Sequence, residues 1–142
     1  MRIVDANVLL YAVNVAAPRH AQARSWLDGA LAGREPIGFA WTVLLAFLRL
    51  ATHPAVFPRP LTASEATDVV RAWLAQPPAT VVEPTPRHAD LLAGLLAEAG
   101  TAANLVGDAH LAALAIEHGA VLVSYDADFG RFAGLRREVP GA

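Results

Sequence analysis

The chain of 142 residues contains no cysteine and no lysine. Without cysteine it can form neither a disulfide bond nor a thiolate metal site, which agrees with a reducing compartment such as the cytoplasm. All eleven basic residues are arginine, and the formal net charge is −2. Proteins that hold nucleic acid by charge alone are usually basic, so a nucleic-acid partner would have to be bound through local features.

Long hydrophobic runs and secretory signals are also missing. The longest apolar stretch, "AWTVLLAFLRLA", is interrupted by Thr42 and Arg49 and is shorter than the roughly 20 residues that cross a bilayer. One basic residue and then Asp5 and Asn7 follow the initial methionine, which does not fit a signal peptide. We therefore expect a cytoplasmic protein without a membrane segment. The length and the 55% hydrophobic content favour a single domain over residues 1–142.

Helical and extended patterns alternate along the whole chain, which is typical of a layered α/β domain with a mainly parallel sheet. Thr62 or Ser64, answered by Glu65, predicts a capping box at the start of one helix. Strands are expected in "RIV", "PIGFA", "ATVVE", "AVLVS" and "LRREV". Helices are expected in "NVLLYAVN", "PRHAQARSWLDGALAG", "WTVLLAFLRLA", "TASEATDVVRAWLAQ", residues 87–98 and residues 104–118.

Acidic side chains follow the first predicted strand and the last buried one. Asp5 stands directly after "RIV", where an uncompensated carboxylate would cost several kcal/mol, so it must be capped, hydrated, paired or bound to a metal. Asp126 and Asp128 follow "VLVS". Ligands of open parallel sheets bind beyond the carboxyl ends of the strands. These acids therefore occupy positions where a functional site is expected.

A further acid, Asp108, lies near the start of a predicted helix. The residues three, four and seven positions later are Leu111, Ala112 and Ala115, so the carboxylate lies above the packed face of its helix. A favourable interaction with the helix dipole would explain Asp108 by itself.

Local explanations exist for the other acids too. Asp5 or Asn7 could cap the first helix, and Asp126 and Asp128 could form a turn. Three separate local explanations would then be needed at positions that a parallel sheet can bring together. The joint pattern favours one shared acidic site.

Carboxylates that converge repel one another unless a cation lies between them. Hard oxygen ligands without cysteine favour Mg²⁺ or Mn²⁺ over zinc. The five histidines include no pair with the four-residue helical spacing of a zinc site, and His110, two residues from Asp108, is expected to be structural. The chain contains no G-x-S-x-G elbow, no P-loop and no G-x-G-x-x-G.

Three segments together resemble the PIN-domain nucleases, and specifically the VapC toxins of the mycobacterial-type subgroup. They are "IVDANVLLYA", "AFLRLATHPAVF" and "NLVGDAHLAALAIEHGAVLVSYDADFGRFAGLR". The resemblance implies a three-layer α/β/α fold with a central, mainly parallel sheet. It also implies an endoribonuclease that depends on Mg²⁺ or Mn²⁺ and acts as the toxin of a type II toxin-antitoxin system. A VapB-type antitoxin and a homodimer are the implied protein partners, and RNA is the implied substrate.

The same resemblance assigns site residues. Asp5 matches the first family acid, Asp108 the third and Asp126 the fourth, and these three are the implied metal ligands. Asp128 is a neighbouring acid that completes the implied catalytic set. Further auxiliary positions are Ser124, Asn7 and Asn104.

One family position differs in this chain. Many family members carry a glutamate in the helix that holds "LLAFLR", and the matching residue here is Ala46. Either Asp5, Asp108 and Asp126 hold the metal with help from Asp128 or water, or the chain binds metal weakly. The alternative function is therefore a weakly active or inactive PIN-like module that binds RNA or a partner protein. A metal-dependent phosphatase acting on small substrates is a third reading.

Two surface features remain open from sequence alone. The apolar helix of residues 41–50 and the loop after it could form a homodimer contact, or the helix could belong to the core. Candidate phosphate contacts are Arg49, Arg131, Arg136 and Arg137, although an ordinary solvated role is the favoured reading for each.

Overall fold

The computed structural model describes residues 1–100 and 102–141, and these residues form a five-stranded parallel sheet. The strand order is β3-β2-β1-β4-β5. The strands are β1 (Arg2–Val4), β2 (Ile37–Phe39), β3 (Ala79–Val81), β4 (Val121–Val123) and β5 (Arg137–Glu138). Each of the five predicted strands is therefore confirmed at its expected place.

Six α-helices connect the strands within the described ranges. They are α1 (Ala6–Val13), α2 (His20–Leu31), α3 (Trp41–Ala51), α4 (Ala63–Leu74), α5 (His88–Ala99) and α6 (Val106–Glu117). Short 3-10 turns, η1 (Ala103–Leu105) and η2 (Ala127–Arg131), precede α6 and follow β4. The helix expected from residue 104 thus starts as a 3-10 turn, whose first residue, Ala103, has a φ of 42°, outside the right-handed helical region.

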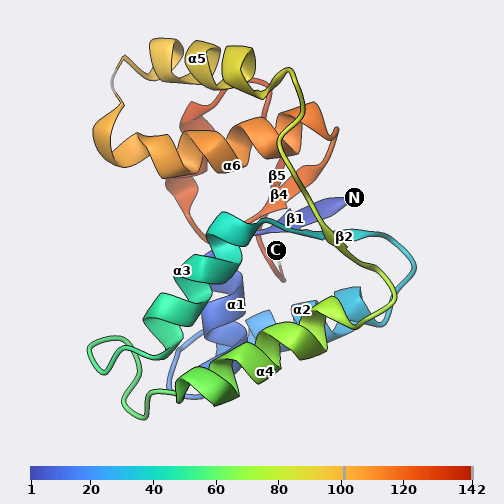
Figure 1. The fold of residues 1–142 in the computed structure, drawn as a ribbon, viewed down its shortest axis with the longest axis vertical. Helices are drawn as coiled ribbons and strands as arrows, with labels where there is room; N and C mark the ends of the chain where they lie inside the picture. The colour runs from blue at the N-terminus through green and yellow to red at the C-terminus, as the bar shows by residue number, and fades with distance from the viewer. Residues whose placement is uncertain (101, 142) are drawn as a thin grey trace.

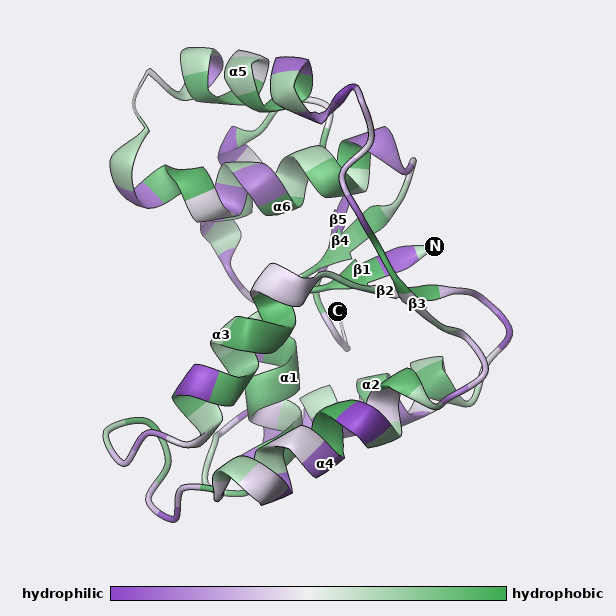
Figure 2. Ribbon diagram, viewed as in Figure 1, coloured by the Kyte–Doolittle hydropathy of each residue, from purple (hydrophilic) through white to green (hydrophobic). Residues whose placement is uncertain are grey.

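Helices cover both faces of the sheet. Figure 1 shows α5 and α6 on one side and α1 to α4 on the other. The predicted three-layer architecture is confirmed. Apolar residues dominate the strands, and hydrophilic residues appear on outer helices such as α4 (Figure 2). No helix in the described ranges is both long and apolar enough to cross a membrane.

Aromatic side chains fill the layer between β2, α3 and α4. The ring of Trp73 stacks on Phe39 with centroids 6.3 Å apart and meets the edge of Phe47 at 4.8 Å. Aromatic pairs in these geometries stabilise a core beyond the area they bury. The predicted capping box is confirmed at α4, where Thr62 accepts from the Glu65 amide and Glu65 accepts from the Thr62 amide.

Helix α3 has two distinct faces. Its residues Val43, Leu44 and Phe47 are buried in the core, as one of the two readings of this helix expected. On the opposite side Trp41 and Leu45 remain 45% and 58% exposed. The core reading is confirmed, and the outer face keeps the dimer contact as a prediction.

The central pair of strands sets the position of the site. β1 and β4 are neighbours although nearly the whole chain separates them, and Val4 lies beside Val123 in the register. From β1 the chain first builds β2 and β3 on one side and later β4 and β5 on the other. The carboxyl ends of β1 and β4 therefore meet at the topological switch point, where open α/β sheets bind ligands.

Close packing between β1 and β2 requires a glycine at position 38. A Cβ atom there would lie 2.8 Å from Cγ1 of Ile3 and 3.1 Å from Cγ1 of Val82.

We expect Gly38→Ala to lower the free energy of unfolding by about 1–3 kcal/mol because the added methyl overpacks the core. Urea denaturation measures this loss. The control is Gly29→Ala in α2. A Cβ atom added there would meet no described atom within 4 Å beyond its chain neighbours and the backbone of its own helix, so the helix should be stabilised by up to about 1 kcal/mol. Equal stability of the two variants would contradict this packing account.

Candidate active site

Asp5 stands at the junction between β1 and α1. Its carboxylate accepts hydrogen bonds from the Ala6 amide at 2.7 Å and from the Ser124 hydroxyl at 2.7 Å. The Asn7 side-chain amide donates to the same carboxylate at 3.2 Å. The capping reading of Asp5 is thus confirmed, but the cap is only one of its contacts. Burial raises the pKa of Asp5 against the lowering effect of the Ser124 and Ala6 hydrogen bonds, and the Asp126 charge raises it further.

Ser124 and Asn7 join the ends of β1 and β4. Ser124 is 2% exposed, and its hydroxyl accepts from the Asp126 amide at 3.0 Å while it donates to Asp5. The Asn7 side chain donates to this hydroxyl at 3.2 Å and accepts from the Tyr125 amide at 3.2 Å. These contacts hold the two strand ends in a fixed relative position and orient the Asp5 carboxylate.

Asp126 and Asp128 occupy the turn after β4. Asp126 caps η2 by accepting from the Asp128 amide at 2.8 Å, which confirms the turn-forming reading. Asp128 is exposed and forms an ion pair with Arg131 at 3.6 Å. The Arg137 guanidinium donates to the main-chain carbonyl of Asp126 at 3.3 Å. The turn therefore combines negative side chains with arginines that already have partners.

Asp108 approaches the other acids from α6. It lies in the first turn of this helix and is partly buried. Burial raises the pKa of its carboxyl, and the charges of Asp126, Asp5 and Asp128 raise it further, in that order. Arg131 opposes this effect. The structure thus brings these acids from three separate elements within electrostatic reach of one another.

The donor set suits a hard divalent cation. Carboxylate oxygens, a serine hydroxyl and an asparagine amide are present, and Mg²⁺ and Mn²⁺ prefer oxygen ligands. Within residues 1–100 and 102–141, no three histidine or acidic side chains form a ready-made group that could hold an ion. Two features keep the carboxylates apart: their like charges repel, and Asp5 and Asp126 each accept a hydrogen bond from a main-chain amide. The assignment of Asp5, Asp108 and Asp126 as ligands stays a prediction.

Other expected residues lie in less direct positions. Asn104 is exposed in η1 and makes no side-chain hydrogen bond to the described residues. Ala46 is partly buried in α3, so this helix contributes no acid. Arg136 donates to the carbonyl of Gly119, which precedes β4, and so lies at the opposite edge of the sheet from the acids. Arg49 is exposed near the end of α3.

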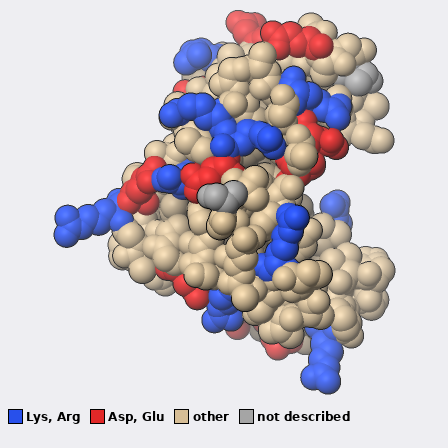
Figure 3. All heavy atoms as spheres, turned by 180° about the vertical axis from the view of Figure 1, so that it is seen from behind, with Lys and Arg blue, Asp and Glu red and all other residues tan. Residues whose placement is uncertain are grey.

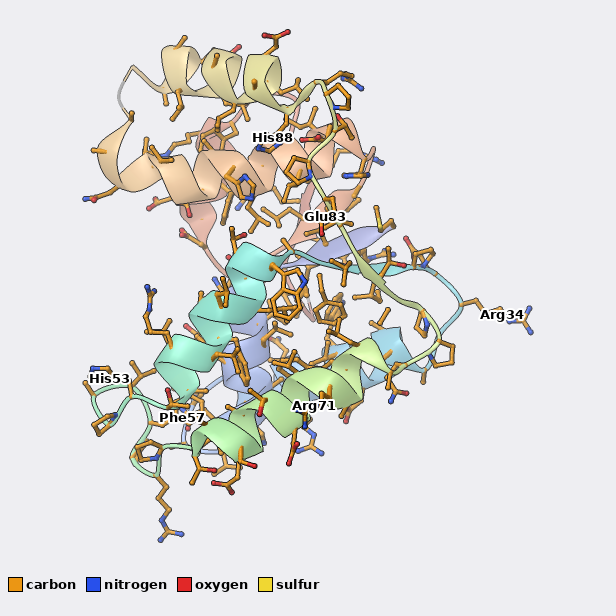
Figure 4. The ribbon with its side chains drawn as sticks, in the orientation of Figure 1. Arg34, His53, Phe57, Arg71, Glu83 and His88 are labelled. Carbon is orange, nitrogen blue, oxygen red and sulfur yellow. The ribbon has the colours of Figure 1, made fainter. Side chains whose placement is uncertain are left out.

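A second polar cluster was not predicted from sequence. The buried Glu117 carboxylate pairs with His88 and accepts a hydrogen bond from the Thr85 amide. Nε2 of His88 lies 2.9 Å from Nδ1 of His110. Figure 4 shows His88 between α5 and α6. Burial lowers the pKa of His110, and the neighbouring His88 charge lowers it further. These contacts tie α5 to α6, which agrees with the structural role expected for His110.

Burial of the Asp108 carboxylate and its repulsion by neighbouring acids predict an effect on stability. Because its folded-state pKa is raised above the ordinary value of 3.8, the stability that it contributes is present below that pH and is lost as the pH rises through the folded-state pKa. We therefore expect Asp108→Asn to stabilise the fold at pH 7 in EDTA by roughly 0.5–1 kcal/mol. Thermal unfolding from neutral pH down to about 4 tests this expectation.

The matched control is Asp90→Asn. Asp90 also lies in the first turn of a helix, α5, so both variants lose the same helix-dipole interaction. The stability difference between them should shrink as the pH falls. A stability difference between the two variants that is constant with pH, or an Asp108→Asn protein that is less stable than the wild type at pH 7, would contradict the raised pKa of Asp108.

Comparisons with known proteins agree with this fold. The PIN domain family matches residues 2–135. Ribonuclease VapC37 of Mycobacterium tuberculosis is 60% identical over 142 residues, which is 100% of this chain and 99% of the relative. Ribonuclease VapC33 of the same species is 43% identical over 136 residues, covering 96% and 95% of the two chains.

Solved structures support the fold at lower identity. VapBC2 from Rickettsia felis, bound to a DNA fragment from the promoter, has a TM-score of 0.72 at 16% identity and covers 98% of both chains. Mycobacterium tuberculosis VapC20, described as a toxin that cleaves the sarcin-ricin loop, has a TM-score of 0.68 at 17% identity, with 96% and 99% covered. With the sequence matches over almost the full length, these findings show that the chain belongs to the VapC family of PIN-domain proteins.

Proposed function

We propose that this chain is an endoribonuclease and the toxin of a type II toxin-antitoxin pair, acting in the cytoplasm. The observation that supports the proposal is that Asp5, Asp108 and Asp126 lie within electrostatic reach of one another, and that the pKa values of Asp5 and Asp108 are raised by burial and by these neighbouring charges. RNA as the substrate is supported by relatives named ribonucleases at 60% and 43% identity.

The acids provide a site for Mg²⁺ or Mn²⁺ in this proposal. Asp5, Asp108 and Asp126 would hold the ion, with Asp128 nearby in the turn after β4. When bound, such an ion lowers the pKa of water and neutralises charge on the phosphate during in-line attack. Raised pKa values at Asp5 and Asp108 fit this role because a bound cation would offset both the burial of these carboxylates and the repulsion from neighbouring acids that raise them.

The surrounding polar residues orient the acids. Ser124 fixes one oxygen of Asp5, and Asn7 holds both Ser124 and the Tyr125 amide. Substitution of a group that supports a metal ligand in this way typically lowers activity or metal affinity by about 10- to 100-fold. Ser124 and Asn7 are therefore positioning residues, and Asn104, exposed in η1, is the least supported member of the predicted set.

Two protein partners complete the proposal. Structural neighbours that contain VapBC pairs support a VapB-type antitoxin. A homodimer is supported by the outer face of α3, where Trp41 and Leu45 are exposed. Neither partner requires a membrane in this proposal.

A second candidate function follows from Ala46. Since α3 carries no acid, the cation would be held by fewer carboxylates than in relatives with a glutamate there. A weakly active or inactive module that binds RNA or a partner protein would have this composition.

RNA cleavage separates the two candidates. Purified protein is incubated with a mixed pool of transfer and ribosomal RNA, in Mg²⁺ or in EDTA. We expect specific cuts that require Mg²⁺, disappear in Asp5→Asn, and slow by about 10- to 100-fold in Ser124→Ala. Asp28→Asn, which changes an exposed acid on α2, is the control and should cut at the wild-type rate. RNA binding without cuts, unchanged by Asp5→Asn, would favour the inactive module.

A further inference from the structure

A cavity of about 380 Å³, in the size range of small-ligand pockets, has Tyr125 in its wall, and Tyr125 adjoins the acidic turn in the chain. It is lined by Pro18, Arg19 and Gln22 at the start of α2, by Tyr125, and by residues 139–141. Tyr125 stands between Ser124 and Asp126, and neighbouring Cα atoms are about 3.8 Å apart. One wall of the cavity therefore begins directly beside the proposed active site.

Tyr125 is a rigid wall of this cavity. Its amide donates to the side chain of Asn7 at 3.2 Å, and its hydroxyl donates to the Gln22 side chain at 2.9 Å. The ring also packs against Tyr11 with centroids 5.3 Å apart. Contacts from α1 and α2 thus hold both the main chain and the side chain of Tyr125.

Arg19 is held over this ring. Its guanidinium carbon lies 4.7 Å from the Tyr125 centroid, within the range of a cation–π interaction. The main chain is also fixed, because Arg19 is the N-cap of α2 and the next amide, that of His20, donates to the Ala17 carbonyl at 3.0 Å. Arg19 forms no ion pair with any carboxylate in the described part of the chain.

Other arginines near the acids are engaged differently. Arg131 pairs with Asp128, and Arg137 donates to the Asp126 carbonyl. Seen from behind, basic side chains gather in the upper half of the molecule, with acidic side chains beside them (Figure 3). Arg19 differs from Arg131 because an aromatic ring, and no carboxylate in the described residues, holds its guanidinium.

We propose that Arg19, held over Tyr125, binds a phosphate of the RNA strand next to the cleaved bond, and that the cavity receives the attached nucleoside. This inference rests on the proposed RNA cleavage. A planar guanidinium matches a phosphate through two N–H groups, and it also offers a face on which an unpaired base can stack. The Gln22 carboxamide at the cavity wall can hydrogen-bond a base edge.

RNA binding to chains that also carry Asp5→Asn tests the proposal without cleavage. The probe is the labelled pool of transfer and ribosomal RNA, measured by filter binding over a range of salt. We expect Arg19→Gln to weaken binding on the order of fivefold and to reduce the slope of log affinity against log salt by about 0.7. Arg34→Gln is the matched control, since Arg34 is exposed and projects away from the chain in Figure 4. Equal affinity and slope in the two variants overturn the proposal.

Substitutions of Tyr125 test how Arg19 is held. Tyr125→Phe keeps the ring and should retain most of the binding, whereas Tyr125→Leu should weaken binding about as much as Arg19→Gln. The double variant Arg19→Gln/Tyr125→Leu should bind as Arg19→Gln does, because the two residues act as one unit. Additive losses overturn the positioning role of Tyr125, and thermal unfolding of each variant checks that the fold is intact.

Cleavage kinetics in the otherwise unchanged chain separate this inference from the proposed function. Arg19→Gln should raise KM more than it lowers kcat. If the wild-type chain cuts RNA and Arg19→Gln behaves like Arg34→Gln, the subsite is wrong and the nuclease stands. If the wild-type chain binds RNA through Arg19 without cutting it, the nuclease is wrong, and of the subsite only the phosphate contact of Arg19 stands. If the chain neither binds nor cuts RNA, both fail.

Discussion

Burial of carboxylates close to one another at the β1–β4 junction is the constraint on which the proposed site depends. Asp5 and Asp126 follow neighbouring parallel strands, and Asp108 enters from the first turn of α6. The pKa of Asp5 and of Asp108 is raised first by burial and then by the neighbouring acids. A fold keeps such an arrangement at a cost to its stability, and that cost is typical of a site selected for binding or chemistry.

The local chain geometry supports this arrangement at several levels. Parallel pairing of β1 with β4 fixes which residues meet, and the Ser124 and Asn7 side chains then hold the two strand ends together. Gly38 allows β2 to lie close against β1. On the far side of the sheet, the buried pair of Glu117 and His88 joins α5 to α6, the helix that carries Asp108. Each of these contacts restricts where the acids can lie.

Much of this arrangement could be predicted from the sequence, for identifiable reasons. Short apolar runs and the Thr62–Glu65 capping box mark elements through local physics, and those elements are confirmed. The acids could be placed at one edge of the sheet because the carboxyl ends of parallel strands share an edge. The roles of Asp5, Asp108, Asp126 and Asp128 stay predictions that the geometry supports.

Contacts between distant residues could not be predicted in the same way. Arg19 meets Tyr125, and His88 meets Glu117, only after the helices pack, and no spacing in the sequence signals either pair. Ala103, in the 3-10 turn before α6, has a positive φ that an alanine in the sequence does not predict. Such features are tertiary, and they determine how a substrate would be held.

Ala46 is the point at which the site differs from the family pattern. A helix without an acid leaves the proposed cation with the ligands of β1, β4 and α6, so the strength of metal binding decides between an active and an inactive protein. Calorimetric titration with Mn²⁺ tests this most directly. We expect saturable binding that is lost in Asp5→Asn and in Asp126→Asn, and kept in Asp28→Asn. Binding that is absent from the wild-type chain, or unchanged by all three substitutions, would contradict it.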